Sequence, residues 1–228
     1  MPRTALQEPI DFDEDQSVAA RIARALAQRI VTGAIAPGAR LRQDHVAAEF
    51  GASHVPVREA FRRLEAQGLA ESEPRRGVRV PPLEPQSIVE ITEMRAALET
   101  LALGHALERI DAKSLALASR AIRDGEASDD VEVWEAANRR FHRSLIAPCA
   151  MPRLLATIDD LHRASARFLF ATWRELNWQR RSEAEHRALL RAVEHRARDE
   201  ALRILETHIR DAGHALVERV GSSAEARR

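Results

Sequence analysis

Apolar residues recur at helical spacing along most of this 228-residue chain, and one cluster of prolines interrupts the pattern. One face of the first predicted helix carries Val18, Ile22, Leu26 and Ile30, each four residues apart. The segment 81–85 contains three prolines and predicts a stiff boundary between domains. We therefore expect a mainly α protein with domains at residues 17–82 and 83–222, after a disordered leader at residues 1–16.

The composition excludes several classes of protein. The longest stretch without a charged side chain runs from Ile30 to Ala39, well short of the roughly 20 residues that cross a bilayer. The single cysteine, Cys149, excludes a disulfide framework and a cysteine-based zinc finger. The N-terminus has no apolar signal core. These features predict a cytoplasmic protein with no membrane partner.

The charge is unevenly distributed, although the whole chain has 35 basic and 35 acidic residues. Residues 17–82 contain 11 arginines and six acidic residues, whereas the remainder is close to neutral. This asymmetry indicates that the first third of the chain meets an anionic partner.

The first third has the outline of a winged helix-turn-helix. A helix follows the predicted N-cap Ser17, a short helical segment at 43–50 ends at Gly51, and a third helix follows Ser53. Two extended runs, at 69–71 and 78–80, then flank a turn containing proline and glycine and predict a β-hairpin. Such a fold places one helix in the major groove of double-stranded DNA, with hydrogen-bond donors at its leading end.

The candidate DNA-binding residues belong to the third helix and to the hairpin. Ser53, His54 and Arg58 lie near the start of that helix, with Pro56 in its first turn and Arg62 one turn further on. In the hairpin, the arginines at positions 75, 76 and 79 surround Gly77, which lets the backbone approach a phosphate or the minor groove. The alternative is a surface helix with solvated arginines. Their coincidence with a helix-turn-helix outline favours DNA binding.

The segment 56–69, PVREAFRRLEAQGL, closely resembles the N-terminal domain of GntR-type transcription regulators, together with Pro37-Gly38 upstream and Arg75-Arg76-Gly77 downstream. The resemblance implies a homodimer that reads a palindromic operator. It implies a base contact for Arg58, and contacts to the DNA backbone or minor groove for Ser53 and for the wing around Arg76 and Gly77. The family usually has arginine where His54 stands and often has arginine where Asp44 stands. Arg42, on the same short helix as Asp44, is the expected replacement, and the operator is expected to differ from the family's commonest one.

Six further amphipathic helices follow the prolines and predict an antiparallel bundle. We place them at residues 85–108, 111–124, 129–146, 151–175, 179–197 and 199–220. Three histidines, His142, His186 and His208, fall on three different helices of this bundle, and Asn138 shares one helical face with His142. Imidazoles with one oxygen ligand suit zinc, nickel or a similar divalent ion. The residues alone leave ordinary core or surface histidines as the alternative, and His162 and four other histidines show no comparable arrangement.

The bundle resembles the FCD effector domain of the FadR branch of this family. That family's pattern is an acid four residues before a histidine, then Glu-His, then a histidine 22 residues later, which here reads Asn138, His142, Glu185-His186 and His208. The resemblance implies a divalent metal site, with zinc favoured over nickel. Asn138 replaces the usual aspartate and carries no charge, so we expect weaker metal retention and a stronger demand for an anionic effector. Arg95 resembles the family's effector-binding arginine, and its alternative role is an ion pair with Glu99.

The leading interpretation is a ligand-responsive transcription regulator, with a repressor favoured, that senses a small organic acid and is not an enzyme. A metal-dependent hydrolase is the alternative, because three histidines with an open position can activate water. Against it, the chain has no HExxH motif, and Glu183 and Glu185 are expected to be solvated. A third possibility is an architectural DNA-binding protein whose bundle only dimerises.

Overall fold

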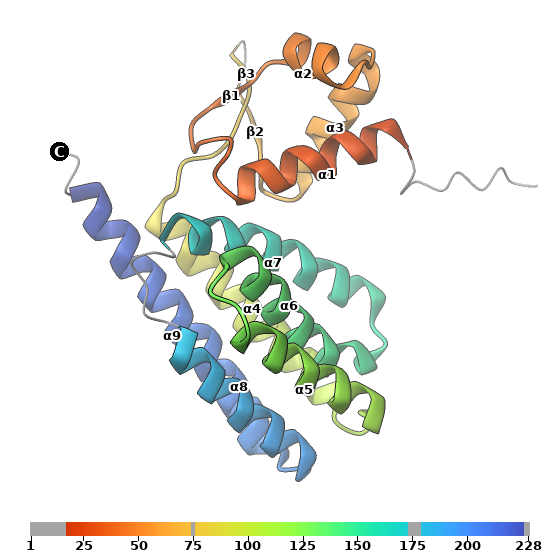
Figure 1. Cartoon of the computed structure of the whole chain (residues 1–228), viewed down its shortest axis with the longest axis vertical. Coiled ribbons are helices and arrows are strands. Elements are labelled where there is room, and N and C mark those ends of the chain that lie inside the picture. Colours follow the sequence, from red (N-terminus) through yellow and green to blue (C-terminus); the bar gives the residue numbers. More distant parts are fainter. Residues whose placement is uncertain (1–16, 74–75, 173–178, 226–228) are drawn as a thin grey trace, which may run out of the picture.

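The structure is a computed structural model that describes residues 17–73, 76–172 and 179–225. The predicted leader, residues 1–16, lies outside the described residues. Figure 1 shows a small N-terminal part of three helices and a small sheet, placed against one end of a larger helical bundle. The mainly α fold predicted from the sequence is confirmed. No helix in the described residues is both long and apolar enough to span a membrane.

The N-terminal part is a winged helix-turn-helix. Its helices are α1 (Val18–Val31), α2 (Gln43–Phe50) and α3 (His54–Ala66). Ser17 caps α1 as predicted, since its hydroxyl accepts a hydrogen bond from the backbone N–H of Ala20. Gly51 ends α2 at a φ of 58°, a conformation that glycine adopts without strain and that turns the chain sharply toward α3.

A three-stranded antiparallel sheet completes this part, with β1 (Arg40–Leu41) between α1 and α2, and β2 (Glu71–Glu73) and β3 (Gly77–Arg79) after α3; the strand order is β1-β3-β2. The hairpin of β2 and β3 is the predicted wing, but Ser72 and Glu73 belong to the strand instead of the turn. β1 has no counterpart in the prediction. It has two residues and pairs with Val78 and Arg79, far along the chain, so its own sequence carries almost no local signal.

The bundle has the six predicted helices within the described residues. They are α4 (Pro85–Ala106), α5 (Ala112–Glu126), α6 (Val131–Ile146), α7 (Pro152–Thr172), α8 (Gln179–Glu194) and α9 (Arg198–Glu225). A short 3₁₀ turn, Ala147–Cys149, separates α6 from α7. α9 continues to Glu225 instead of ending near residue 220. α4 packs against α6, α7 and α9, which places its side chains at the centre of the bundle.

Each part has its own hydrophobic core. The N-terminal core is built from residues between Ile22 and Val80, and includes Leu26, Val57 and Leu64. The bundle core includes Leu103, Phe141 and Leu145, and a smaller cluster joins Ile88 to Phe168 and Leu216. α4 and α9 lie close together at Gly213, where a β-carbon would overlap the side chain of Thr92. These helices therefore depend on glycine at that position.

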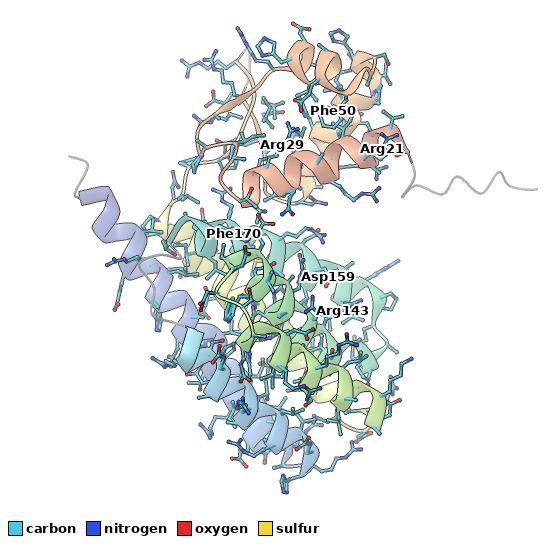
Figure 2. All side chains as sticks on the ribbon, in the orientation of Figure 1. Arg21, Arg29, Phe50, Arg143, Asp159 and Phe170 are labelled. Atoms are coloured by element: carbon cyan, nitrogen blue, oxygen red, sulfur yellow. The ribbon has the colours of Figure 1, made fainter. Side chains whose placement is uncertain are left out.

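The two parts are joined by a short link that the bundle holds directly. Arg167 on α7 donates hydrogen bonds from Nη2 to the backbone carbonyls of Pro81 and Pro82, at 2.9 and 2.5 Å. Its side chain is buried at this junction, and Gln28 on α1 donates to Glu132 on α6. A crevice of about 760 Å³ lies between α1 and α3 on one side and α6 and α7 on the other. Phe170 lines it, and Figure 2 shows this residue at the boundary.

Candidate nucleic-acid interface and metal centre

The N-terminal part carries a basic groove between α3, the start of α2 and the wing. Its volume is about 470 Å³, and five arginines line it: Arg40, Arg42, Arg58, Arg62 and Arg76. The apolar residues of α3, Val57 and Leu64 among them, face the core and so fix which face carries the charges. Arg29 and Phe50, labelled in Figure 2, belong to a separate contact between α1 and α2, where the guanidinium lies over the ring.

The structure brings most of the predicted DNA-binding residues to this groove. Arg42, Arg58, Arg62, Arg76 and Gly77 line it, and all five are exposed. Ser53 and His54 are exposed at the leading end of α3, and Pro56 is half-buried in its first turn. Ser53 makes no hydrogen bond to the helix that it precedes, so its hydroxyl is not used as a cap. Gly77 has a φ of 86°, which lets the wing turn tightly beside Arg76.

Of the other two arginines of the predicted wing, Arg79 and Arg75, the structure describes Arg79, which is not among the residues that line the groove. Arg79 points back into the sheet and pairs with Glu71 and Glu73, at 2.7 and 3.1 Å, so its charge is engaged within the protein. Arg75 lies outside the described residues. Arg40 lines the groove and was not predicted. Its only sequence signal is its place after the Pro37-Gly38 turn and two residues before Arg42.

Two acidic residues also line the basic groove. Glu65 accepts a hydrogen bond from the Ser72 hydroxyl. Asp44 has an exposed side chain, and its Oδ1 lies 3.7 Å from Nδ1 of His54. The two residues at which the sequence departs from the family pattern are therefore neighbours in space.

The three predicted histidines converge in the bundle. His142 on α6, His186 on α8 and His208 on α9 are all buried, and their nearest ligand nitrogens all lie within 4.8 Å of one another. Nε2 of His186 and Nε2 of His208 are 3.2 Å apart. Because these rings come from three helices, the packing of the whole bundle sets their positions.

Two carboxylates each contact the Nδ1 atom of one ring and orient that ring. Glu99 Oε2 lies 2.8 Å from Nδ1 of His142, and Glu185 Oε2 lies 2.8 Å from Nδ1 of His208. A carboxylate on one ring nitrogen fixes the tautomer and directs the other nitrogen toward a metal. Glu99 was not predicted in this role, and Glu185 is half-buried and not solvated as expected. These carboxylates supply negative charge that Asn138 lacks.

Burial favours the neutral form of two of these rings, His142 and His186. It lowers the pKa of His142 to about 4, although Glu99 acts in the opposite direction. It also lowers the pKa of His186 well below its usual value, and the neighbouring His208 and His142 add to this effect. A neutral imidazole has a free lone pair, which is the form that binds a metal.

The donor atoms fit a divalent ion. Among the described residues, Nε2 of His142 and Oδ1 of Asn138 are buried atoms without a hydrogen-bond partner, and so is Oγ of Ser182 nearby. Leaving buried polar atoms unpaired costs free energy, and an ion among these atoms would remove that cost. The set of three imidazoles and one amide oxygen matches the ligand types of zinc and nickel.

A cavity of about 60 Å³ lies beside the histidines and connects them to Arg95. Asn138, His142 and His208 line it together with Arg95 and Ser165. Arg95 makes the ion pair that was its alternative role, since its Nε lies 2.9 Å from Glu99 Oε1. Its Nη1 donates to the Ser165 hydroxyl at 3.3 Å, so the guanidinium pairs with Glu99 and faces the cavity at the same time.

His162 belongs to the same cluster, and the expectation that it has no comparable arrangement is wrong. It is buried, its Nε2 lies 3.1 Å from Glu99 Oε1, and its ring lies 5.4 Å from that of His142. Burial raises the pKa of Glu99, but its electrostatic interactions with His162, Arg95 and His142 outweigh burial and hold that pKa well below its usual range. Glu99 therefore stays ionised between the candidate metal-binding histidines and the cavity arginine. The signal was missed because His162 and Glu99 are 63 positions apart.

Residues 18–80 match the family described as bacterial regulatory proteins, gntR family, and residues 90–211 match the FCD domain. A protein of Paenarthrobacter nicotinovorans named "Probable D-xylose utilization operon transcriptional repressor" is 33% identical over 147 residues, 64% of this chain and 65% of that protein. The HTH-type transcriptional repressor GlaR of Escherichia coli is 24% identical over 203 residues, 82% of this chain and 90% of GlaR. The chain thus spans about two thirds of the first of these relatives.

The fold is also found in solved structures. Escherichia coli McbR/YncC has a TM-score of 0.78 at 23% identity, covering 90% of this chain and 99% of that one. A GntR family member from Pseudomonas syringae has a TM-score of 0.58 at 30% identity, covering 92% and 89%. The relatives named here are transcription regulators, so they give no support to the metal-dependent hydrolase considered from the sequence.

Proposed function

Since this chain belongs to the gntR family of bacterial regulatory proteins and carries an FCD domain, we propose that it is a DNA-binding transcription regulator that responds to a small organic acid. One observation carries this proposal: the same chain has a basic groove on its winged helix-turn-helix and a cavity lined by buried histidines in its bundle. In this proposal, residues 17–82 bind DNA, and residues 83–222 bind the effector and form the homodimer.

The DNA-binding half of the proposal uses the leading end of α3. Arg58 is exposed in the groove and would reach a base edge in the major groove, where a bidentate arginine–guanine contact is worth about 1–3 kcal/mol of discrimination. Arg42, Arg62 and Arg76 would neutralise phosphates on either side. Two copies of the chain, related by a two-fold axis, would read the two halves of a palindrome.

The effector half of the proposal uses both ends of the cavity. His142, His186 and His208, with Asn138, would hold a divalent ion, zinc in preference to nickel. A divalent ion at this place would supply a positive centre that attracts an oxygen ligand. Arg95, at the cavity wall, would hold a carboxylate of the effector. The cavity is small, which favours a small acid over a large one.

Helix α7 connects the effector cavity to the segment that joins the two domains. Ser165 on this helix accepts a hydrogen bond from Arg95, and Arg167, two residues on, holds the carbonyls of Pro81 and Pro82. An acid that draws Arg95 away from Ser165 would therefore act on the helix that fixes the link. The change in operator affinity can be no larger than the difference in effector affinity between the two arrangements of the domains. We favour a repressor, in keeping with the names of the two relatives.

The proposal is tested on the purified full-length protein. Elemental analysis measures the bound metal, and melting temperatures are then recorded with a panel of di- and tricarboxylates and sugar acids. A gel shift with DNA from upstream of its own gene follows, with and without each acid that raises the melting temperature. We expect bound metal, specific DNA binding and one acid class that changes it. Specific DNA binding with no acid that raises the melting temperature would favour the architectural alternative.

The Arg58→Ala variant supplies the matched test of the DNA surface. We expect it to lose discrimination at one base position while the metal content stays the same, since the two sites lie in different domains. A loss of affinity that is uniform over all operator sequences would instead assign Arg58 to a phosphate contact.

A further inference from the structure

One carboxylate stands at the leading end of the recognition helix, among the arginines of the basic groove. Asp44 lines this groove together with Arg42 and Arg58, and its side chain is 85% exposed. The other acidic residue of the groove, Glu65, accepts a hydrogen bond from Ser72. Among the described residues, the one ion pair recorded for Asp44 is with His54, whose Nδ1 lies 3.7 Å from its Oδ1. It therefore faces the proposed DNA position with most of its oxygen surface open.

Asp44 is fixed to the leading end of α3 by its neighbour in sequence. Gln43 donates a hydrogen bond from Nε2 to the backbone carbonyl of His54, the first residue of α3, at 3.1 Å. The first turn of α2 is thus tied to the first turn of α3. In helix-turn-helix proteins the first turn of the recognition helix lies against base edges. Asp44 consequently lies on the part of the surface that meets bases.

The chemistry of a carboxylate limits what it can do at that place. An ionised carboxylate only accepts hydrogen bonds, and phosphates repel it. In the major groove, a carboxylate that contacts a base accepts from the amino group N4 of cytosine, whereas an amide pairs with adenine through N6 and N7. A carboxylate here therefore discriminates for cytosine and against bases that present only acceptors, such as guanine.

We propose that Asp44 is a specificity-determining residue that reads a cytosine in each half of the operator. The inference rests on the proposed function, because it requires that the groove binds double-stranded DNA.

The test is selection of bound duplexes from a random pool by the full-length protein, followed by sequencing. The wild type is compared with Asp44→Ala and Asp44→Asn. We expect the wild type to enrich a palindrome with cytosine at one position of each half-site. Asp44→Ala should lose that preference alone, with discrimination falling about tenfold or more, and Asp44→Asn should change the preferred base from cytosine to adenine.

Glu65→Gln is the matched control, since it removes one negative charge from the same groove and keeps an acceptor for Ser72. We expect its enriched sequence to equal that of the wild type. If Asp44→Ala, Asp44→Asn and Glu65→Gln all raise affinity for every sequence without changing the preferred bases, Asp44 only repels phosphates and the inference is wrong.

Two further outcomes also separate the possibilities. Asp44 is an acidic residue in the first turn of α2, where its negative charge can stabilise the helix by interacting with the helix dipole. A lower melting temperature for Asp44→Ala with unchanged preferred bases would assign it this structural role and overturn the inference, while the proposed function stands. A wild-type protein that enriches no sequence at all would overturn both.

Discussion

Glu99 is the residue whose replacement tests the description of the histidine site most directly. Its carboxylate is fully buried and lies 2.9 Å from Arg95 Nε, 2.8 Å from His142 Nδ1 and 3.1 Å from His162 Nε2. The variant Glu99→Ala removes all three contacts. It leaves a mostly buried guanidinium, with 12% of its side chain exposed, without its partner carboxylate.

The size of the expected loss in the free energy of unfolding follows from this burial. Removing one partner of a buried ion pair costs about 3–5 kcal/mol, because the remaining charge has lost its compensation. Loss of a carboxylate that orients a metal-binding histidine also lowers metal affinity by about 10- to 100-fold. We therefore expect Glu99→Ala to lower the free energy of unfolding by about 3–5 kcal/mol in the metal-free protein, and to weaken metal binding as well.

Urea denaturation of the metal-free protein measures the free energy of unfolding. A metal titration in a calorimeter measures the metal affinity. Glu93→Ala is the control, because Glu93 lies on the same helix but pairs with Arg210 at the surface, with half of its side chain exposed. Exposed pairs contribute about 0–1 kcal/mol. Equal losses of stability for the two variants, or an unchanged metal affinity for Glu99→Ala, would refute the role assigned to Glu99.

Three other predictions address the metal site and the helix packing. His186→Ala should abolish bound metal by elemental analysis while the metal-free protein still binds its operator; unchanged metal content would remove His186 from the site. Asn138→Asp should tighten metal binding and weaken effector binding, because a charged ligand satisfies the ion, and calorimetry that finds both affinities unchanged would contradict this. Gly213→Ala should lower the free energy of unfolding by about 1–3 kcal/mol through overlap with Thr92, measured by urea denaturation.

The control for the glycine variant is Gly104→Ala. A β-carbon there would lie 3.2 Å from the end of the Arg198 side chain, which can move aside. A destabilisation by Gly104→Ala as large as that by Gly213→Ala would show that helix packing at residue 213 is not the cause.

Most of the fold follows from patterns that are local in the sequence. The four-residue spacing from Val18 to Ile30 defines α1, and the N-cap Ser17 is visible one residue earlier. The prediction of α2 is confirmed with both its limits, because Gly51 marks its end. The strand β1 was missed because it exists only through pairing with residues 78 and 79, a contact that no local pattern reports.

The residues of the histidine site also fall into two groups, those that local spacing predicts and those that only helix packing brings together. Asn138 and His142 share a helix face, so their proximity is predictable from spacing alone. His186 and His208 lie on other helices, and their place beside His142 came from the resemblance and not from periodicity. Glu99 and His162 escaped prediction because only the packing of α4 against α7 brings them together. Contacts between helices set this cluster, and a single sequence carries little signal for them.

The hydrogen bonds of Arg167 have a consequence for how the junction between the domains varies. Their acceptors are main-chain carbonyl oxygens, which every amino acid provides. Substitutions at positions 81 and 82 therefore leave the acceptors in place. One inserted residue would displace them by about 3.3–3.6 Å, more than a hydrogen bond can stretch. The junction is tolerant of changes in residue type and intolerant of changes in length.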